Sequence, residues 1–144
     1  MARIVLVIGA VLWTLAGLVS LALAAGAADA ILSLLPPLVI DADAVAGAMT
    51  AFGVGFLLLG ATHGGVVLGL RREQRPAHSA GILLAAIMAS GLVALAAAAV
   101  ASAARDSASA PALLGGGIGA GIGAIGYALT AARLVGERRS GSAV

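Results

Sequence analysis

The sequence has no cysteine, no lysine and very little charge: only 10% of its 144 residues are Asp, Glu, Lys or Arg. The missing cysteine excludes disulfides, thiolate metal sites, iron–sulfur clusters and a cysteine nucleophile. Soluble globular domains carry about 25% charged residues, so a chain with this composition is not expected to be one. The few arginines lie at the edges of apolar runs, and we therefore expect no nucleic-acid partner.

Long apolar runs occupy most of the chain, which is 62% hydrophobic. A helix needs about 20 apolar residues to cross a hydrocarbon core roughly 30 Å thick. The sequence therefore predicts an all-α fold: an integral membrane four-helix transmembrane bundle that forms one domain, 1–144. The predicted spans are 4–28, 44–70, 77–104 and 112–135.

The first run resembles a secretory signal peptide at its end, where Ala22 to Ala27 is rich in small residues. Its apolar stretch is longer than the 7–15 residues of a signal-peptide core, so we expect a retained span. The connector Asp29–Asp43 contains Pro36 and Pro37, which interrupt a helix. We interpret it as an apolar loop at the outer interface; a lid over a cavity or a docking surface are the alternatives.

Charge is distributed unevenly between the two predicted ends of the spans. Arginine is enriched on the cytoplasmic side of membrane proteins. Seven of the eight basic residues fall on one side, which predicts a multi-pass cell-membrane protein with both termini cytoplasmic. These seven are Arg3, Arg71, Arg72, Arg75, Arg133, Arg138 and Arg139; the other side has Arg105 with Asp29, Asp41, Asp43 and Asp106. The polar residues from Gly136 onward predict a frayed tail.

The turn between the second and third spans holds the densest polar cluster, and its candidate ligand-binding residues are His63, His78, Arg71, Arg72 and Arg75. The arginines serve first as a topology anchor, since each gains about 1 kcal/mol near an anionic leaflet. Together with the histidines, they are also a candidate site for a phosphate or carboxylate.

His63 lies inside a span, roughly 10 Å from its end at 1.5 Å per residue. An ionisable residue in a span is a candidate functional group. A neutral histidine bonded to a helix backbone is the simpler interpretation; a proton relay, a ligand site or a haem ligand are the others. His63 and His78 differ in predicted depth by roughly 7 Å, which argues against a shared metal, so we predict neither a metal nor a cofactor.

Glycines recur at four-residue spacing and predict close helix packing. Small residues let helices approach in lipid, where hydrophobic association is weak. The predicted packing positions are Gly60, Gly64, Gly65, Gly69, Gly115, Gly119 and Gly123. The run Gly115-Gly117-Gly119-Gly121-Gly123 resembles the packing helix of rotary ATP-synthase proteolipid subunits. Those subunits carry a carboxylate in mid-membrane, whereas no predicted span here does, so the resemblance implies tight packing and nothing about ion transport.

Three functions follow as hypotheses. The first is a non-catalytic subunit or interaction partner in a larger membrane assembly, or a homo-oligomer, embedded in the lipid bilayer. The second is a small transporter or channel, although the spans lack an acidic residue. The third is a membrane enzyme or a lipid-binding protein that acts at the cytoplasmic interface through His63, His78 and the nearby arginines. The question of enzymatic activity stays open, and a non-catalytic role is favoured.

Overall fold

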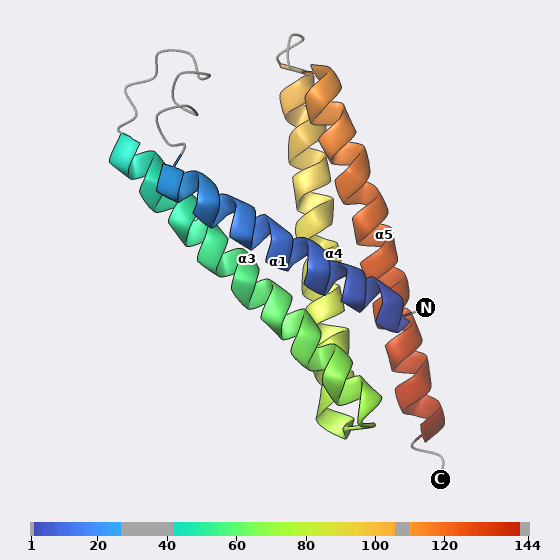
Figure 1. The fold of residues 1–144 in the computed structure, drawn as a ribbon. Helices are drawn as coiled ribbons and strands as arrows, with labels where there is room; N and C mark the ends of the chain where they lie inside the picture. The colour runs from blue at the N-terminus through green and yellow to red at the C-terminus, as the bar shows by residue number, and fades with distance from the viewer. Residues whose placement is uncertain (1, 27–41, 106–109, 142–144) are drawn as a thin grey trace. The chain divides into compact units, whose positions relative to one another are not determined.

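The computed structural model describes residues 2–26, 42–105 and 110–141. Within these ranges the chain forms four helices, shown in Figure 1: α1 (Ala2–Gly26), α3 (Ala42–Arg71), α4 (Arg75–Ala103) and α5 (Ala110–Gly141). All four are long and apolar enough to cross a membrane. The prediction of an all-helical chain with four candidate spans is confirmed for this part of the molecule, while the prediction of one domain stays a prediction.

The helix ends differ from the predicted spans mainly at the carboxyl terminus. The expected frayed tail was wrong for residues 136–141, because α5 continues to Gly141. Polar contacts within this last stretch, described below, support the extra helix. The predicted connector Asp29–Asp43 lies largely outside the described residues, as do residues 106–109, which follow the third predicted span.

The described residues group into two compact units. One contains Met1–Val5 and Val66–Val144 and is called here the α4–α5 unit; the other, Leu6–Gly65, is called the α1–α3 unit. In the α4–α5 unit, α4 and α5 lie side by side and run antiparallel (Figure 1). A Cβ at Gly81 would lie 3.0 Å from Leu134, and one at Gly123 would lie 3.0 Å from Leu92. Glycine at these positions lets the two backbones approach.

The face that α5 buries is regular. Its buried residues are Gly117, Ala120, Ala124, Tyr127, Thr130 and Leu134. Their spacing of three or four residues places them along one side of the helix. On α4, the four-residue ladder Ala77, Gly81 and Ala85 is likewise buried. The small residues of this ladder explain why the helices can approach closely here.

The α1–α3 unit is also an antiparallel helix pair held at glycine. A Cβ on Gly17 would lie 2.8 Å from the carbonyl oxygen of Gly53, and one on Gly53 would lie 2.7 Å from Leu21. Gly60 faces Thr14, whose backbone nitrogen is 3.0 Å from the position of a Cβ. Trp13 and Phe56 pack beside this contact with ring centroids 5.3 Å apart. Each glycine therefore occupies a position where a larger residue would separate the helices.

The turn between α3 and α4 is built by backbone hydrogen bonds. The Gln74 amide donates to the Gly69 carbonyl at 3.1 Å, and the Glu73 amide donates to the Leu70 carbonyl at 3.4 Å. This pattern is a Schellman motif, in which the residue directly after the helix cap adopts the left-handed conformation. Glu73 occupies that place with φ 55°. Gln74 then occupies the N-cap position of α4, and Pro76 lies in the first turn of that helix.

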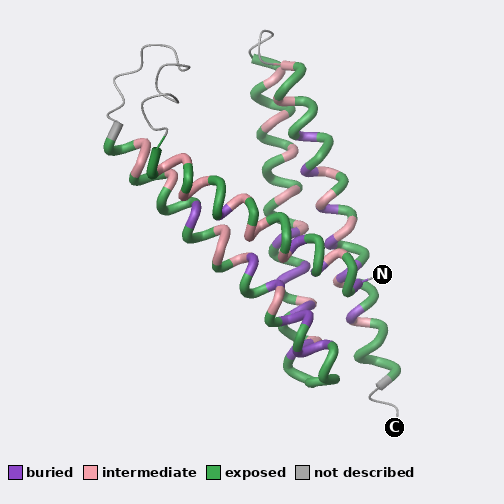
Figure 2. The backbone as a smooth tube through the Cα atoms, viewed as in Figure 1, coloured by how far each residue is buried: buried purple, intermediate pink, exposed green. Residues whose placement is uncertain are grey.

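Exposed positions extend along all four helices (Figure 2), and many of them hold large apolar residues. Ile118 and Ile122 on α5 are 66% and 67% exposed, and Leu58 on α3 is 64% exposed. In water such surfaces cost free energy in proportion to their area, by roughly 25 cal/mol per Å². Lipid chains solvate them without that cost, so the surface fits a bilayer.

Candidate functional site

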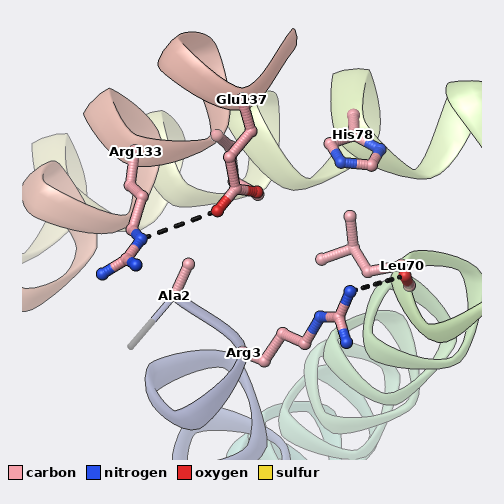
Figure 3. A pocket seen from close by; sticks show the side chains of 7 residues that line it. Ala2, Arg3, Leu70, His78, Arg133 and Glu137 are labelled. Carbon is pink, nitrogen blue, oxygen red and sulfur yellow. Dashed lines mark hydrogen bonds and ion pairs between the residues drawn. The ribbon is translucent and has the colours of Figure 1, made fainter. Parts of the chain in front are cut away.

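A cavity of about 310 Å³ opens within the α4–α5 unit, where three segments distant in the sequence meet (Figure 3). The first turn of α1, the last turn of α3 with the start of α4, and the end of α5 all contribute to it. Its lining is Ala2, Arg3, Leu70, His78, Arg133, Leu134 and Glu137. Four of these seven side chains are charged or titratable, although charged residues are scarce in the chain as a whole.

Arg3 reaches from α1 to the end of α3. Its Nη2 atom donates a hydrogen bond to the Leu70 carbonyl at 3.2 Å, as Figure 3 shows. The last carbonyls of a helix have no partner within that helix, and a cation suits the negative end of the helix dipole. This bond therefore orients the guanidinium at the cavity and leaves its other N–H groups available to a ligand.

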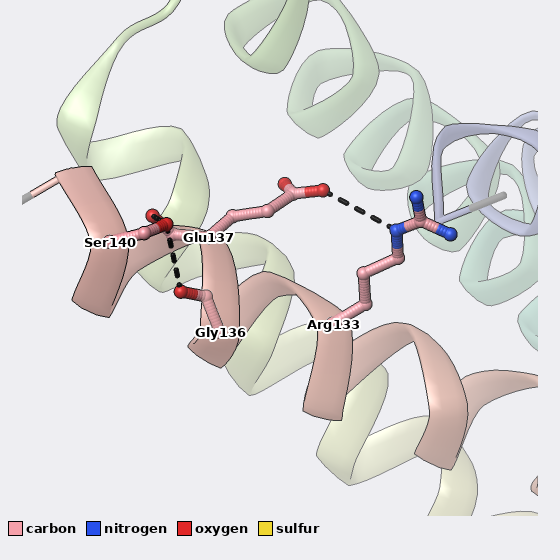
Figure 4. A network of polar contacts seen from close by, with 4 residues as sticks. All are labelled: Arg133, Gly136, Glu137 and Ser140. Carbon is pink, nitrogen blue, oxygen red and sulfur yellow. Dashed lines mark hydrogen bonds and ion pairs between the residues drawn. The ribbon is translucent and has the colours of Figure 1, made fainter.

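Arg133 and Glu137 come from the last turns of α5 (Figure 4). Their Nε and Oε1 atoms lie 3.6 Å apart, and the two side chains are 57% and 50% exposed. An exposed pair at this separation contributes less than about 1 kcal/mol to stability. Ser140 donates to the Glu137 carbonyl at 3.0 Å and the Gly136 carbonyl at 3.2 Å. The pair therefore helps α5 to extend but leaves Arg133 free to bind an additional anion.

The charges around the cavity are unequal. Two guanidinium groups, Arg3 and Arg133, face one carboxylate, Glu137, and His78 adds a ring that donates or accepts hydrogen bonds. With His78 neutral, the lining carries a net charge of about +1, since arginine is always protonated in proteins. An arrangement of this kind attracts a monovalent anion, and guanidinium groups match the geometry of phosphate and carboxylate oxygens.

A second cavity, of about 220 Å³, adjoins the first. It shares Ala2 and Arg133 with it and is otherwise lined by Val5, Gly126, Leu129 and Thr130. The Thr130 hydroxyl donates to the Gly126 carbonyl at 2.9 Å, so its polar group is satisfied within α5. The remaining lining atoms are mainly apolar.

The predicted ligand-binding residues divide between different places. His78 lines the first cavity, whereas Arg71, Arg72 and Arg75 are exposed in and beside the α3–α4 turn and line neither cavity. Sequence reasoning missed Arg3, Arg133 and Glu137 as site residues. The available signal was the charge pattern, which already placed Arg3 and Arg133 on the same side of the membrane as the turn.

His63 is wholly buried in α3. Its Nδ1 atom lies 2.8 Å from the Leu59 carbonyl oxygen one turn earlier. A carbonyl oxygen only accepts, so Nδ1 carries the proton of this hydrogen bond. His63 lines neither of the two cavities. This geometry agrees with the simpler interpretation of a histidine bonded to its own helix, and a ligand role for His63 stays an untested prediction.

The predicted packing glycines also differ in their surroundings. Gly60, Gly69 and Gly123 lie where a Cβ would press on a neighbouring helix. At Gly64, Gly65, Gly115 and Gly119, a Cβ would meet no atom within 4 Å. Within its own unit, each of these four positions has no close neighbour, so the contacts described for the two helix pairs do not use these glycines.

Among the described residues, no three His, Asp or Glu side chains gather closely enough to hold a metal ion. The arrangement supports anion binding at the first cavity, and the described contacts point to no specific reaction. Comparison of the chain with protein families, with curated proteins and with solved structures finds no match.

Proposed function

We propose that this protein is a non-catalytic membrane subunit that packs against another membrane protein or against copies of itself. The observation that carries the proposal is the presence of two small-residue faces on α5. One face, which includes Gly117, packs on α4, where a Cβ on Gly117 would lie 3.2 Å from Ala99. The other face, with Gly115 and Gly119, is exposed and meets nothing within 4 Å.

Glycine is unfavourable in a helix by about 1 kcal/mol relative to alanine. Lipid contact alone gains nothing from glycine, because larger apolar side chains fit lipid equally well. A face of glycines four residues apart gives access to the backbone for close helix packing. The exposed pair Gly115 and Gly119 is therefore best explained by a partner helix. On α3, Gly47, Ala51 and Gly55 repeat the same exposed four-residue pattern.

We further propose that both termini and the α3–α4 turn face the cytoplasm. Arg3 and Arg133 line one cavity with His78 from the start of α4, so these three segments lie at one end of the α4–α5 unit. At the same end, Arg71 ends α3, Arg72 follows in the turn and Arg75 begins α4. Arginine enrichment at that end supports a cytoplasmic location by the positive-inside rule.

Purification of a tagged chain from its native host in mild detergent, with native mass measured on the same sample, tests the proposal. A stoichiometric protein partner, or a defined multiple of the chain mass, is the expected result. A uniform monomer that persists across several mild detergents and in lipid nanodiscs would contradict it.

A further inference from the structure

The two cavities of the α4–α5 unit differ in polarity but share two lining residues, Ala2 and Arg133. The polar cavity is lined by Glu137 toward the end of α5, while the apolar one is lined by Gly126 and Leu129, about two turns deeper along the helix. The seven steps from Gly126 to Arg133 span roughly 10 Å of helix. Polar and apolar spaces therefore follow one another along α5.

This order matches the order of groups in a phospholipid. The phosphate of a bound phospholipid would lie at the interface, where Arg3, Arg133 and His78 provide donors. A lining charge of about +1 balances the single negative charge of a phosphodiester. An acyl chain then continues inward past Val5 and Leu129, where the missing side chain of Gly126 leaves room.

Each part of the site has a feature that a general lipid-facing surface lacks. The guanidinium of Arg3 is fixed by its bond to the Leu70 carbonyl, so it is oriented before a ligand arrives. Thr130 directs its hydroxyl to its own helix, which keeps the inner slot apolar. Leu129, which lines that slot, is 60% exposed like other apolar residues of the helix surface, so an acyl chain has access to the slot from the side.

We infer that these joined cavities bind one phospholipid, with its phosphodiester between Arg3, Arg133 and His78 and one acyl chain along Val5, Gly126 and Leu129. The inference is independent of the packing proposal, because none of these residues belongs to the open face of Gly115 and Gly119. Free phosphate shares the headgroup chemistry, and the chain requirement separates it from a lipid.

Native mass spectrometry of the detergent-purified protein, titrated with dioleoyl phosphatidylglycerol, measures the site directly. One lipid should bind with defined affinity. Glycerophosphoglycerol, which lacks chains, and inorganic phosphate should not bind at the same concentrations. Dioleoylglycerol, which lacks the phosphate, should bind with an affinity at least about tenfold lower, since charge-assisted hydrogen bonds are lost.

Variants assign the binding to these residues. Arg133→Gln and Arg3→Gln should each weaken lipid binding about tenfold, while Arg138→Gln, an exposed arginine on α5 outside both cavities, should not. Arg133 makes no bond to another helix in the described chain, so its variant reports on binding even if Arg3→Gln disturbs folding. Gly126→Leu should fill the slot and weaken binding while the protein stays monodisperse.

The inference is wrong if Arg133→Gln and Arg138→Gln change the affinity equally, because binding would then reflect general surface charge. Tight binding of inorganic phosphate without any gain from acyl chains would also overturn it, since the apolar cavity would contribute nothing. An unchanged lipid affinity of Gly126→Leu would show that no acyl chain binds in the slot beside Gly126.

Discussion

Arg3 in the first turn of α1 donates a hydrogen bond to the carbonyl of Leu70 in the last turn of α3, with 3.2 Å between Nη2 and oxygen. The two residues are far apart in the sequence, and Leu70 is almost wholly buried. The bond joins the start of one candidate span to the end of the next, and it gives the Leu70 carbonyl a charged donor besides the Glu73 amide of the turn. It also positions one of the two guanidinium groups of the cavity.

Replacement of Arg3 by Met should lower the free energy of unfolding by about 1 kcal/mol, because the Leu70 carbonyl loses its charged donor and keeps only the Glu73 amide at 3.4 Å. Thermal unfolding in detergent, followed by circular dichroism, measures the change. Arg138→Met removes another exposed arginine, one that lines neither cavity, and serves as the control. Equal stability of the two variants would show that the bond contributes nothing.

Glu73→Gly should stabilise the protein by about 1 kcal/mol. Glu73 has φ 55°, a left-handed conformation that is unfavourable for residues with a Cβ and easily adopted by glycine. Arg72→Gly, one residue earlier, is the matched control and should not stabilise. The midpoints of chemical unfolding of the two variants and the wild type measure the difference. A loss of stability in Glu73→Gly would contradict the described turn.

Gly69→Ala should destabilise the α3–α4 turn by about 1–3 kcal/mol, as overpacking does elsewhere. A Cβ on Gly69 would lie 2.6 Å from the Cβ of Ala77. Gly65→Ala in the same helix is the control, because a Cβ there meets nothing within 4 Å.

The double variant Gly69→Ala with Ala77→Gly tests the same contact by a double-mutant cycle. Removing the Ala77 methyl group should restore most of the stability that Gly69→Ala loses. If the two effects simply add, the two residues do not oppose each other across the turn.

Single introduced cysteines test the proposed membrane orientation, because the chain has no native cysteine that a thiol reagent could label. Ser140→Cys near the end of α5 should react with a membrane-impermeant maleimide only after the cells are permeabilised. Ala104→Cys, after the end of α4, should react in intact cells. The reverse pattern would place both termini outside and contradict the cytoplasmic location.

The sequence predicts the four helices well because apolar length is a local property. It predicts the end of α5 less well, since the contacts of Arg133 with Glu137 and of Ser140 with its own helix act within a polar stretch that hydropathy treats as tail. The turn is recognisable from Pro76, whereas the left-handed Glu73 is not, because glycine is the usual residue there.

The site was predicted only in part. His78 was identified by its place in a polar cluster, but the cavity takes its other charges from Arg3, Arg133 and Glu137, and only folding brings those segments together. The spacing of the glycines likewise did not predict which side of α5 packs on α4. Because α5 has glycines on several sides, the sequence does not show that α4 contacts Gly117 while Gly119 stays open.

The most direct test of the packing proposal is the native mass of three α5 variants in the mild detergent that preserves the wild-type assembly. Gly119→Leu should weaken assembly about tenfold, which corresponds to about 1.4 kcal/mol, and leave the fold intact because a Cβ there has open space. Ala132→Leu, on the exposed side of α5 with Ile118 and Ile125, should assemble normally. Gly117→Leu should disturb the fold itself through Ala99. If Gly119→Leu and Ala132→Leu assemble as the wild type does, the open glycine face of α5 is not a subunit interface.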